Sequence, residues 1–104
     1  MVDNQLEALS VATRRVIYQM LIDRPRAVSE IAASLPVSRP AVSQHLKVLL
    51  AADLVQVSRK GNRHIYSADP AGMGVLRDWI DRMWTKAMES FSEFAREQME
   101  ARDE

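Results

Sequence analysis

The segment from Val37 to Leu54 constrains this chain more than any other stretch, because it specifies both a helix and the two faces of that helix. Ser38 is a good N-cap, and Pro40 fits the first turn, where a missing N–H costs little. Apolar residues then recur at i, i+4, i+7 and i+8, which places them on one stripe of the helix. The members of this apolar stripe are Val42, Leu46, Leu49 and Leu50.

The opposite face of this predicted helix is polar and carries no carboxylate. It holds Pro40, Ser43, Gln44 and Lys47, with Arg39 to one side near the helix start. A short helix that presents hydroxyl, amide and cationic groups suits the major groove of DNA. That groove is about 12 Å wide and displays base edges with which such side chains can pair.

A shorter helix is predicted directly before this one. Residues 29–35 fit a helix that Ser29 would cap, with Ile31, Ala32 and Leu35 pointing inward. The joint at residues 36–38 is too short for anything but a sharp corner. Helix, short turn and helix with a polar outer face is the pattern of a helix-turn-helix unit. An ordinary corner between two helices remains the alternative.

A basic β-hairpin is predicted after the second helix. Leu54–Arg59 alternates and is rich in β-branched residues, Lys60–Asn62 supplies a turn, and Arg63–Ala68 returns as the second strand. The tip would carry three cations: Arg59, Lys60 and Arg63. Such a hairpin is typical of a wing that lies on the phosphate backbone or in the minor groove. The alternative is a solvated hairpin whose charges only maintain solubility.

The charges of the chain are segregated although their sum is zero. Residues 38–67 hold five basic side chains and one acidic side chain, which gives a local charge of +4. Residues 68–104 hold five basic and nine acidic side chains, which gives −4, while residues 1–37 hold four of each. A neutral protein normally argues against nucleic acid, but here the basic middle can face DNA while the acidic end points away.

Taken together, these motifs resemble the ArsR family of bacterial winged-helix repressors. The resemblance extends over nearly the whole chain, in five segments: Ala12–Arg15 with Val16, Ile17 and Leu21; Ser29–Ala32; Ser38–Leu49; Ala52–Val55; and Arg59–Tyr66. It implies a homodimer that binds a palindromic operator in double-stranded DNA, usually as a repressor. The family's DNA-contacting positions match Arg39, Ser43, Gln44 and residues 59–63. With the polar helix face, the predicted DNA-binding set is Arg39, Pro40, Ser43, Gln44, Lys47, Arg59, Lys60, Asn62 and Arg63.

A long final helix is predicted from about residue 70 to residue 100. Asp69 is a suitable N-cap and Pro70 a suitable first residue, although Gly72 and Gly74 weaken the first turns. Its apolar surface is too wide for one core contact, so we expect one side to pack on its own domain and the other on a partner subunit. A pocket for an apolar ligand between subunits is the alternative. The predicted dimer interface comprises Leu6, Leu9, Trp79, Met83, Trp84, Met88 and Phe91.

The predicted fold is a single domain over residues 1–104, mainly α with a minor β component (α+β). It is a winged helix-turn-helix with the helix-turn-helix at about 29–51, a two- to three-stranded wing at about 54–68 and the long dimerisation helix. A first helix is expected at residues 4–9, and a short strand at Ala27–Val28. The second helix would end near Asp23, with Ser10 or Thr13 as its cap. Its buried face would comprise Val16, Ile17, Met20 and Leu21, and Arg14 and Arg15 near its start would either reach phosphate or form a solvated end.

The sequence offers no basis for catalysis or for a metal site. It has no cysteine and only two histidines, His45 and His64, neither with a nucleophile at useful spacing. Many ArsR-family members bind metals or arsenic through cysteines before the recognition helix, or through histidines and carboxylates on the last helix. Both sets are missing here, and carboxylates alone make a poor transition-metal site. We therefore expect no metal and no cofactor, so any inducer would be another signal.

The chain begins without a signal peptide and contains no apolar run of membrane length. The expected protein is therefore a cytoplasmic transcriptional regulator that does not contact a membrane. The other class of function left open is a winged-helix module used only for protein–protein contacts. A basic wing argues against that alternative, because a protein-binding wing would more often be apolar or mixed in charge.

Overall fold

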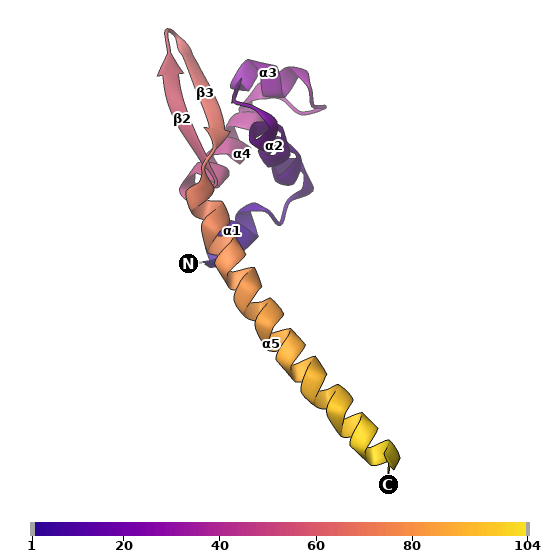
Figure 1. Ribbon diagram of the computed structural model, residues 1–104. Coiled ribbons are helices and arrows are strands. Elements are labelled where there is room, and N and C mark those ends of the chain that lie inside the picture. Colours follow the sequence, from indigo (N-terminus) through magenta and orange to yellow (C-terminus); the bar gives the residue numbers. More distant parts are fainter. Residues whose placement is uncertain (1, 104) are drawn as a thin grey trace.

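The structure, a computed structural model that describes residues 2–103, combines five helices with one small sheet (Figure 1). In chain order the elements are α1 (Val2–Ala8), α2 (Ala12–Asp23), β1 (Arg26–Ala27), α3 (Val28–Ala33), α4 (Arg39–Ala51), β2 (Val55–Lys60), β3 (Arg63–Ala68) and α5 (Pro70–Asp103). The mainly helical winged fold with a long C-terminal helix is thus confirmed.

The sheet is antiparallel, with strands in the order β1-β3-β2. Lys60 pairs with Arg63 across the hairpin, which leaves a two-residue turn whose first residue, Gly61, has a φ of +61°. Glycine at this position fits the tight turns that match the twist of paired strands. The third strand was expected at Ala27–Val28 but lies one residue earlier, because Val28 already begins α3.

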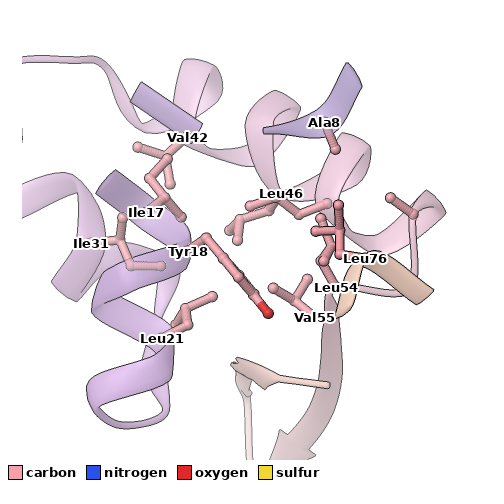
Figure 2. Packing of buried hydrophobic residues seen from close by; sticks show 12 residues of the cluster. Ala8, Ile17, Tyr18, Leu21, Ile31, Val42, Leu46, Leu54, Val55 and Leu76 are labelled. Atoms are coloured by element: carbon pink, nitrogen blue, oxygen red, sulfur yellow. The ribbon is translucent and has the colours of Figure 1, made fainter. Parts of the chain in front are cut away.

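One apolar core joins the helices to the base of the hairpin. Its fully buried side chains come from α2, α3, α4 and the start of the hairpin: Ile17, Leu21, Ile31, Val42, Leu46, Leu49, Leu54 and Val55. Figure 2 shows side chains of this core, among them Ile17, Leu21, Leu46 and Val55, gathered around Tyr18. The predicted inward position of Val16 is wrong, since its side chain is 41% exposed and Tyr18 is buried instead. The buried stripe of α2 is therefore rotated relative to the predicted one.

Two predicted helix caps are also wrong. Val11 precedes α2 without a side-chain cap, and the Ser10 hydroxyl instead donates to the Glu7 carbonyl at the end of α1. Helix α3 begins one residue before Ser29. Its first turn is closed from the other side, because the Ala27 N–H donates to Glu30 Oε1 at 3.1 Å.

The corner between α4 and the hairpin is a Schellman motif. Asp53 adopts φ 57°, its N–H donates to the Leu50 carbonyl, and the Leu54 N–H donates to the Leu49 carbonyl. The Asp53 carbonyl then accepts the N–H of Gly72 in α5 at 2.8 Å. A Cβ on Gly72 would lie 2.5 Å from that carbonyl oxygen. This contact fixes the start of α5 against the end of α4, and it gives Gly72 a role that was not predicted.

Helix α5 starts as predicted and then leaves the rest of the molecule. The Ala71 N–H donates to Asp69 Oδ1 at 3.0 Å, so Asp69 caps the helix that Pro70 begins. Figure 1 shows α5 projecting away from the other elements, and the molecule measures 73 × 26 × 21 Å. Leu76 is buried and Trp79 half-buried, but between Ile80 and Arg102 every side chain except the half-buried Ala95 is exposed. The expectation that one side packs on its own domain therefore holds only for the first turns.

Candidate nucleic-acid interface

Helix α4 presents the polar face that its sequence predicts. Ser38 caps it, with its hydroxyl accepting the Ala41 N–H at 3.3 Å. The apolar stripe through Val42, Leu46 and Leu49 is fully buried, so the opposite face must point outward. The polar residues are accordingly exposed, with Ser43 partly so: Arg39, Pro40, Ser43, Gln44 and Lys47.

The hairpin carries its cations at the tip, where β2 and β3 are exposed. Arg59, Lys60, Asn62 and Arg63 are all exposed. The Arg59 Nε donates to the Gly61 carbonyl at 3.2 Å, which holds this guanidinium beside the turn. The hairpin tip is therefore a local positive surface, as the sequence predicts, although DNA contact by these residues stays a prediction.

A carboxylate connects the hairpin to the helices behind it. Glu30 Oε1 lies 3.0 Å from Arg63 Nη2, and Glu30 Oε2 lies 3.4 Å from Arg24 Nη1. The Ala27 N–H, followed by Arg24 and Arg63, holds the pKa of Glu30 below its ordinary value. Arg63 thus has a protein partner and is not the free phosphate contact that the sequence alone suggested. The signal for Glu30 was available, since a glutamate at the third position of a helix often closes its first turn.

A small cleft lies where the hairpin turn meets α3 and the start of α4. Its volume is about 130 Å³. It brings together three predicted DNA-binding residues, Arg39, Asn62 and Arg63, with two that the prediction omitted, Ser29 and His64. Ser43, Gln44 and Lys47 do not line it. The predicted set therefore divides into the cleft, the outer face of α4 and the two tip residues Arg59 and Lys60.

The two arginines at the start of α2 have a structural role. The Arg14 Nε donates to the Ala8 carbonyl at 2.7 Å, and the Arg15 Nη1 donates to the Leu9 carbonyl at 2.7 Å. These carbonyls belong to the end of α1 and its loop, where cationic donors are favourable. Of the two interpretations that the sequence left open, the structure favours a helix end over a phosphate contact.

Comparisons with known proteins agree with this geometry. A family model described as a helix-turn-helix domain matches residues 9–58. The transcriptional regulator Rv2034 of Mycobacterium tuberculosis is 48% identical over 91 residues, covering 88% of this chain and 85% of that protein. An ArsR-like transcriptional regulator from Rhodococcus has a solved structure that superposes with a TM-score of 0.76 at 29% identity, covering 90% of this chain and 92% of that one. This chain belongs to the ArsR family.

The family membership fixes the class of activity. This ArsR-family protein is a DNA-binding transcriptional regulator and not an enzyme, since its relatives are regulators of transcription. A further relative, the transcriptional repressor SdpR of Bacillus subtilis, is 33% identical over 81 residues, which cover 78% of this chain and 87% of that protein. The helix-turn-helix match includes α2, α3, α4 and the start of β2, and therefore the whole outer face of α4.

The residues predicted for the dimer interface of this ArsR-family chain lie on α1, directly after it at Leu9, and on the neighbouring α5. Leu6 is 39% exposed, whereas Leu9 is partly buried against the chain's own core. Trp79 is half-buried, and the others are exposed: Met83, Trp84, Met88 and Phe91. The Gln5 side chain, which is buried, donates to the Ala52 carbonyl at 2.7 Å and so ties α1 to the end of α4.

Two structural observations concern other classes of site in this ArsR-family protein. Within residues 2–103, no three histidine, cysteine or acidic side chains come together as a metal-binding group would require. No helix in this same range combines the length and the apolar character needed to cross a membrane.

Proposed function

We propose that this chain is a cytoplasmic homodimeric repressor that binds a palindromic DNA operator with one recognition helix in each half-site. The observation that carries the proposal is the exposed, carboxylate-free face of α4 beside a hairpin with a cationic tip. The relative named as a repressor, SdpR, supports the direction of regulation. The segregation of charge supports DNA as the partner, because only the middle of the chain carries excess positive charge.

The proposed dimer follows from the exposed apolar surface of α5. Trp84, Met88 and Phe91 lie at i, i+4 and i+7, which places them on one stripe of the helix. Trp84 is 67% exposed and Phe91 is 63% exposed. Soluble monomers rarely leave a continuous apolar stripe of this size in water. Most of the stability of a protein helix also comes from the packing of its apolar face against other elements. A second copy of the same stripe, related by a two-fold axis, would supply both burial and support.

The proposed division of labour places base reading on α4 and phosphate contact on the hairpin. Ser43 and Gln44 lie on the outer face of α4, where an amide can pair with adenine in the major groove. Arg59 and Lys60 at the hairpin tip would contact the phosphate backbone. Arg63 would contribute less than either, because Glu30 already holds its guanidinium.

The test is selection of bound sequences from random duplex DNA by the full chain, followed by affinity measurements over a range of salt. We expect a palindrome whose half-sites are about one helical turn apart, near 34 Å. Lys60→Ala should weaken binding to the operator and to random DNA alike, and it should reduce the salt slope by about one unit for each phosphate that Lys60 no longer neutralises. A protein–protein module would instead enrich no sequence and bind DNA without a steep salt dependence.

A further inference from the structure

The cleft between the hairpin turn, α3 and the start of α4 has the composition of an anion site. Its polar lining comprises two guanidinium groups, an imidazole, an amide and a hydroxyl, from Arg39, Arg63, His64, Asn62 and Ser29. All five are hydrogen-bond donors, and guanidinium groups are well suited to phosphate oxygens. No carboxylate lines the cleft, and its 130 Å³ admits a phosphate group.

Glu30, the carboxylate that pairs with the lining residue Arg63, is already engaged. Glu30 accepts the Ala27 N–H and lies within ion-pairing distance of Arg24 and Arg63. It therefore holds Arg63 at the rim of the cleft without opposing an anion as a free carboxylate would. The lining itself holds Arg39 and Arg63, of which only Arg63 is paired with Glu30, so the site remains net positive.

The position of the cleft indicates which phosphate it would take. It lies between the hairpin and the first residue of α4, the two elements proposed to contact the groove and the backbone of DNA. Figure 1 shows α3 beside the upper part of this hairpin. A backbone phosphate of duplex DNA is therefore the anion that this position favours.

We propose that this cleft holds one backbone phosphate of bound DNA in each subunit, and that Ser29 and His64 are phosphate contacts. The proposal rests on the proposed DNA-binding function and adds two residues to it. Ser29 would donate its hydroxyl to a phosphate oxygen. His64 would donate an N–H and, when protonated, add a positive charge next to the phosphate.

A histidine in this position makes DNA affinity depend on pH. The charged groups around His64 are Arg39 from α4, Arg63 from its own strand, Arg59 paired with it on β2, and Glu30 of α3 behind Arg63. The arginines do not titrate in the accessible range, and a bound phosphate favours the imidazolium. The complex would therefore bind more protons than the free protein, so affinity for DNA would rise as the pH falls.

The first experiment measures binding of the full chain to random duplex DNA by fluorescence anisotropy at pH 8 and pH 6. Wild-type affinity should rise about three- to tenfold on acidification, because a protonated imidazole adds a charge-assisted contact to the phosphate. His64→Gln should abolish the rise. At pH 6 it should also reduce the salt slope by about one unit for each subunit's phosphate, a reduction that should be absent at pH 8. The matched control is His45→Gln, because His45 is the only other histidine in the chain and it should leave the rise intact.

The outcomes separate this proposal from the function on which it rests. If the wild type fails to bind DNA at either pH, the proposed function itself fails. If DNA binds but His64→Gln keeps the full pH dependence, the phosphate assignment is overturned while DNA binding stands. Ser29→Ala should weaken binding at least about tenfold, as loss of one hydrogen bond to a charged group predicts, without a change in salt slope. Unchanged affinity would remove Ser29 from the site.

A second experiment distinguishes a DNA phosphate from a free one. Operator duplexes with a single methylphosphonate at each backbone position in turn should reveal one position per half-site at which wild-type affinity falls. At that position the Ser29→Ala, His64→Gln double variant should lose no further affinity. If inorganic phosphate shifts the His64 imidazole resonance while no methylphosphonate position behaves in this way, the cleft binds small anions only and the proposal is wrong.

Discussion

The body of the molecule, from α1 to the first turns of α5, buries large apolar side chains, whereas the projecting part of α5 leaves them exposed. In the body, Ile17, Leu46 and Leu54 are completely buried, and the exposed face of α4 is polar. Beyond Trp79, α5 leaves Trp84 and other large apolar side chains in contact with solvent. The body therefore buries its apolar surface by itself, whereas the projecting helix can bury its apolar stripe only against a partner. That difference separates the region that binds DNA from the region that would bring two copies together.

Charge follows the same division. The positive excess lies in residues 38–67, which include α4 and most of the hairpin, while residues 68–104 carry an excess of four negative charges. An acidic helix is repelled by phosphate, so it favours orientations in which α5 points away from DNA. Its apolar stripe is then available to a partner and not to the duplex.

The largest expected effect comes from removing the covering partner. Trp84→Glu combined with Phe91→Glu should give monomers, because burial of each such aromatic contributes roughly 1.5–3 kcal/mol and each occurs twice in a symmetric dimer. Operator affinity should collapse, since one recognition helix makes too few contacts. Sedimentation of both proteins at tens of micromolar measures the change.

The control for this pair keeps the charge change and moves it to the polar side of the helix. Lys86→Glu also lowers the net charge by two units but lies away from Trp84 and Phe91 on the helical wheel. It should leave the dimer intact. A double variant that remains dimeric, or a wild type that sediments as a monomer, would remove the distinction between a complete body and an incomplete helix.

The joint between the two regions should be sensitive to a single methyl group. Gly72→Ala places a Cβ 2.5 Å from the Asp53 carbonyl oxygen, so α5 or the corner after α4 must shift. We expect a loss of about 1–3 kcal/mol in the free energy of unfolding, measured by urea denaturation. Gly74→Ala, where a Cβ meets nothing within 4 Å, should instead stabilise by about 0.5–1 kcal/mol. Equal effects at the two glycines would contradict the close contact.

This joint also marks where prediction from the sequence stopped. The helix-turn-helix, the hairpin and the start of α5 at Asp69 and Pro70 were predictable because capping and periodicity are local signals. Gly72 was taken for a weak helix position, since nothing in the sequence reveals a carbonyl from residue 53 beside it. Val16 was misassigned and Tyr18 was omitted for the same reason: adjacent stripes of α2 are both apolar, and only tertiary packing chooses between them.

The candidate site was predicted on α4 and at the hairpin tip but not between them. Arg63 and Glu30 are 33 positions apart in the sequence. Their ion pair forms only because the hairpin packs beside α3, which no local pattern reveals. His64 was considered only as a catalytic group or metal ligand, and Ser29 only as a cap. Their place in one cleft with Arg39 depends on the arrangement of three elements, which composition and periodicity do not specify.

Within the body, base specificity should be separable from nonspecific affinity for DNA. Gln44→Ala removes an exposed side chain and should cost roughly 1–3 kcal/mol at one symmetric base position, while leaving binding to random DNA nearly unchanged. Base-preference profiles of wild type and variant measure this. Lys47→Ala, on the same face, should weaken both kinds of binding and serve as the contrast. Identical profiles for wild type and Gln44→Ala would show that Gln44 does not read bases.

A smaller effect should appear where charge joins elements of the body. Because the pKa of Glu30 is lowered from its ordinary value of 4.5, the charged carboxylate stabilises the fold at pH values above 4.5. This contribution disappears as the pH falls through the lowered pKa. Glu30→Gln keeps an acceptor for the Ala27 N–H but removes the charge. The variant should have the lower Tm at pH 7, and the difference should shrink towards pH 3. A difference that is constant with pH would point to altered packing and not to the missing charge.

The smallest expected effect is the response to metal ions, which should be absent. The chain has no cysteine, and both of its histidines lie in the body, His45 on α4 and His64 on β3. Helix α5 offers only carboxylates and no nitrogen ligand, which is a poor donor set for Zn²⁺ or Cd²⁺. Arsenite has no thiolate to bind.

Micromolar Zn²⁺, Cd²⁺ or arsenite should therefore not release DNA from the protein, as fluorescence anisotropy of a labelled operator would measure. Specific, stoichiometric release that a chelator reverses would require ligands from two copies to meet across α5. In that case α5 would contribute to a metal site as well as to the dimer interface. The division between a body that recognises DNA and a helix that only joins two subunits would then be wrong.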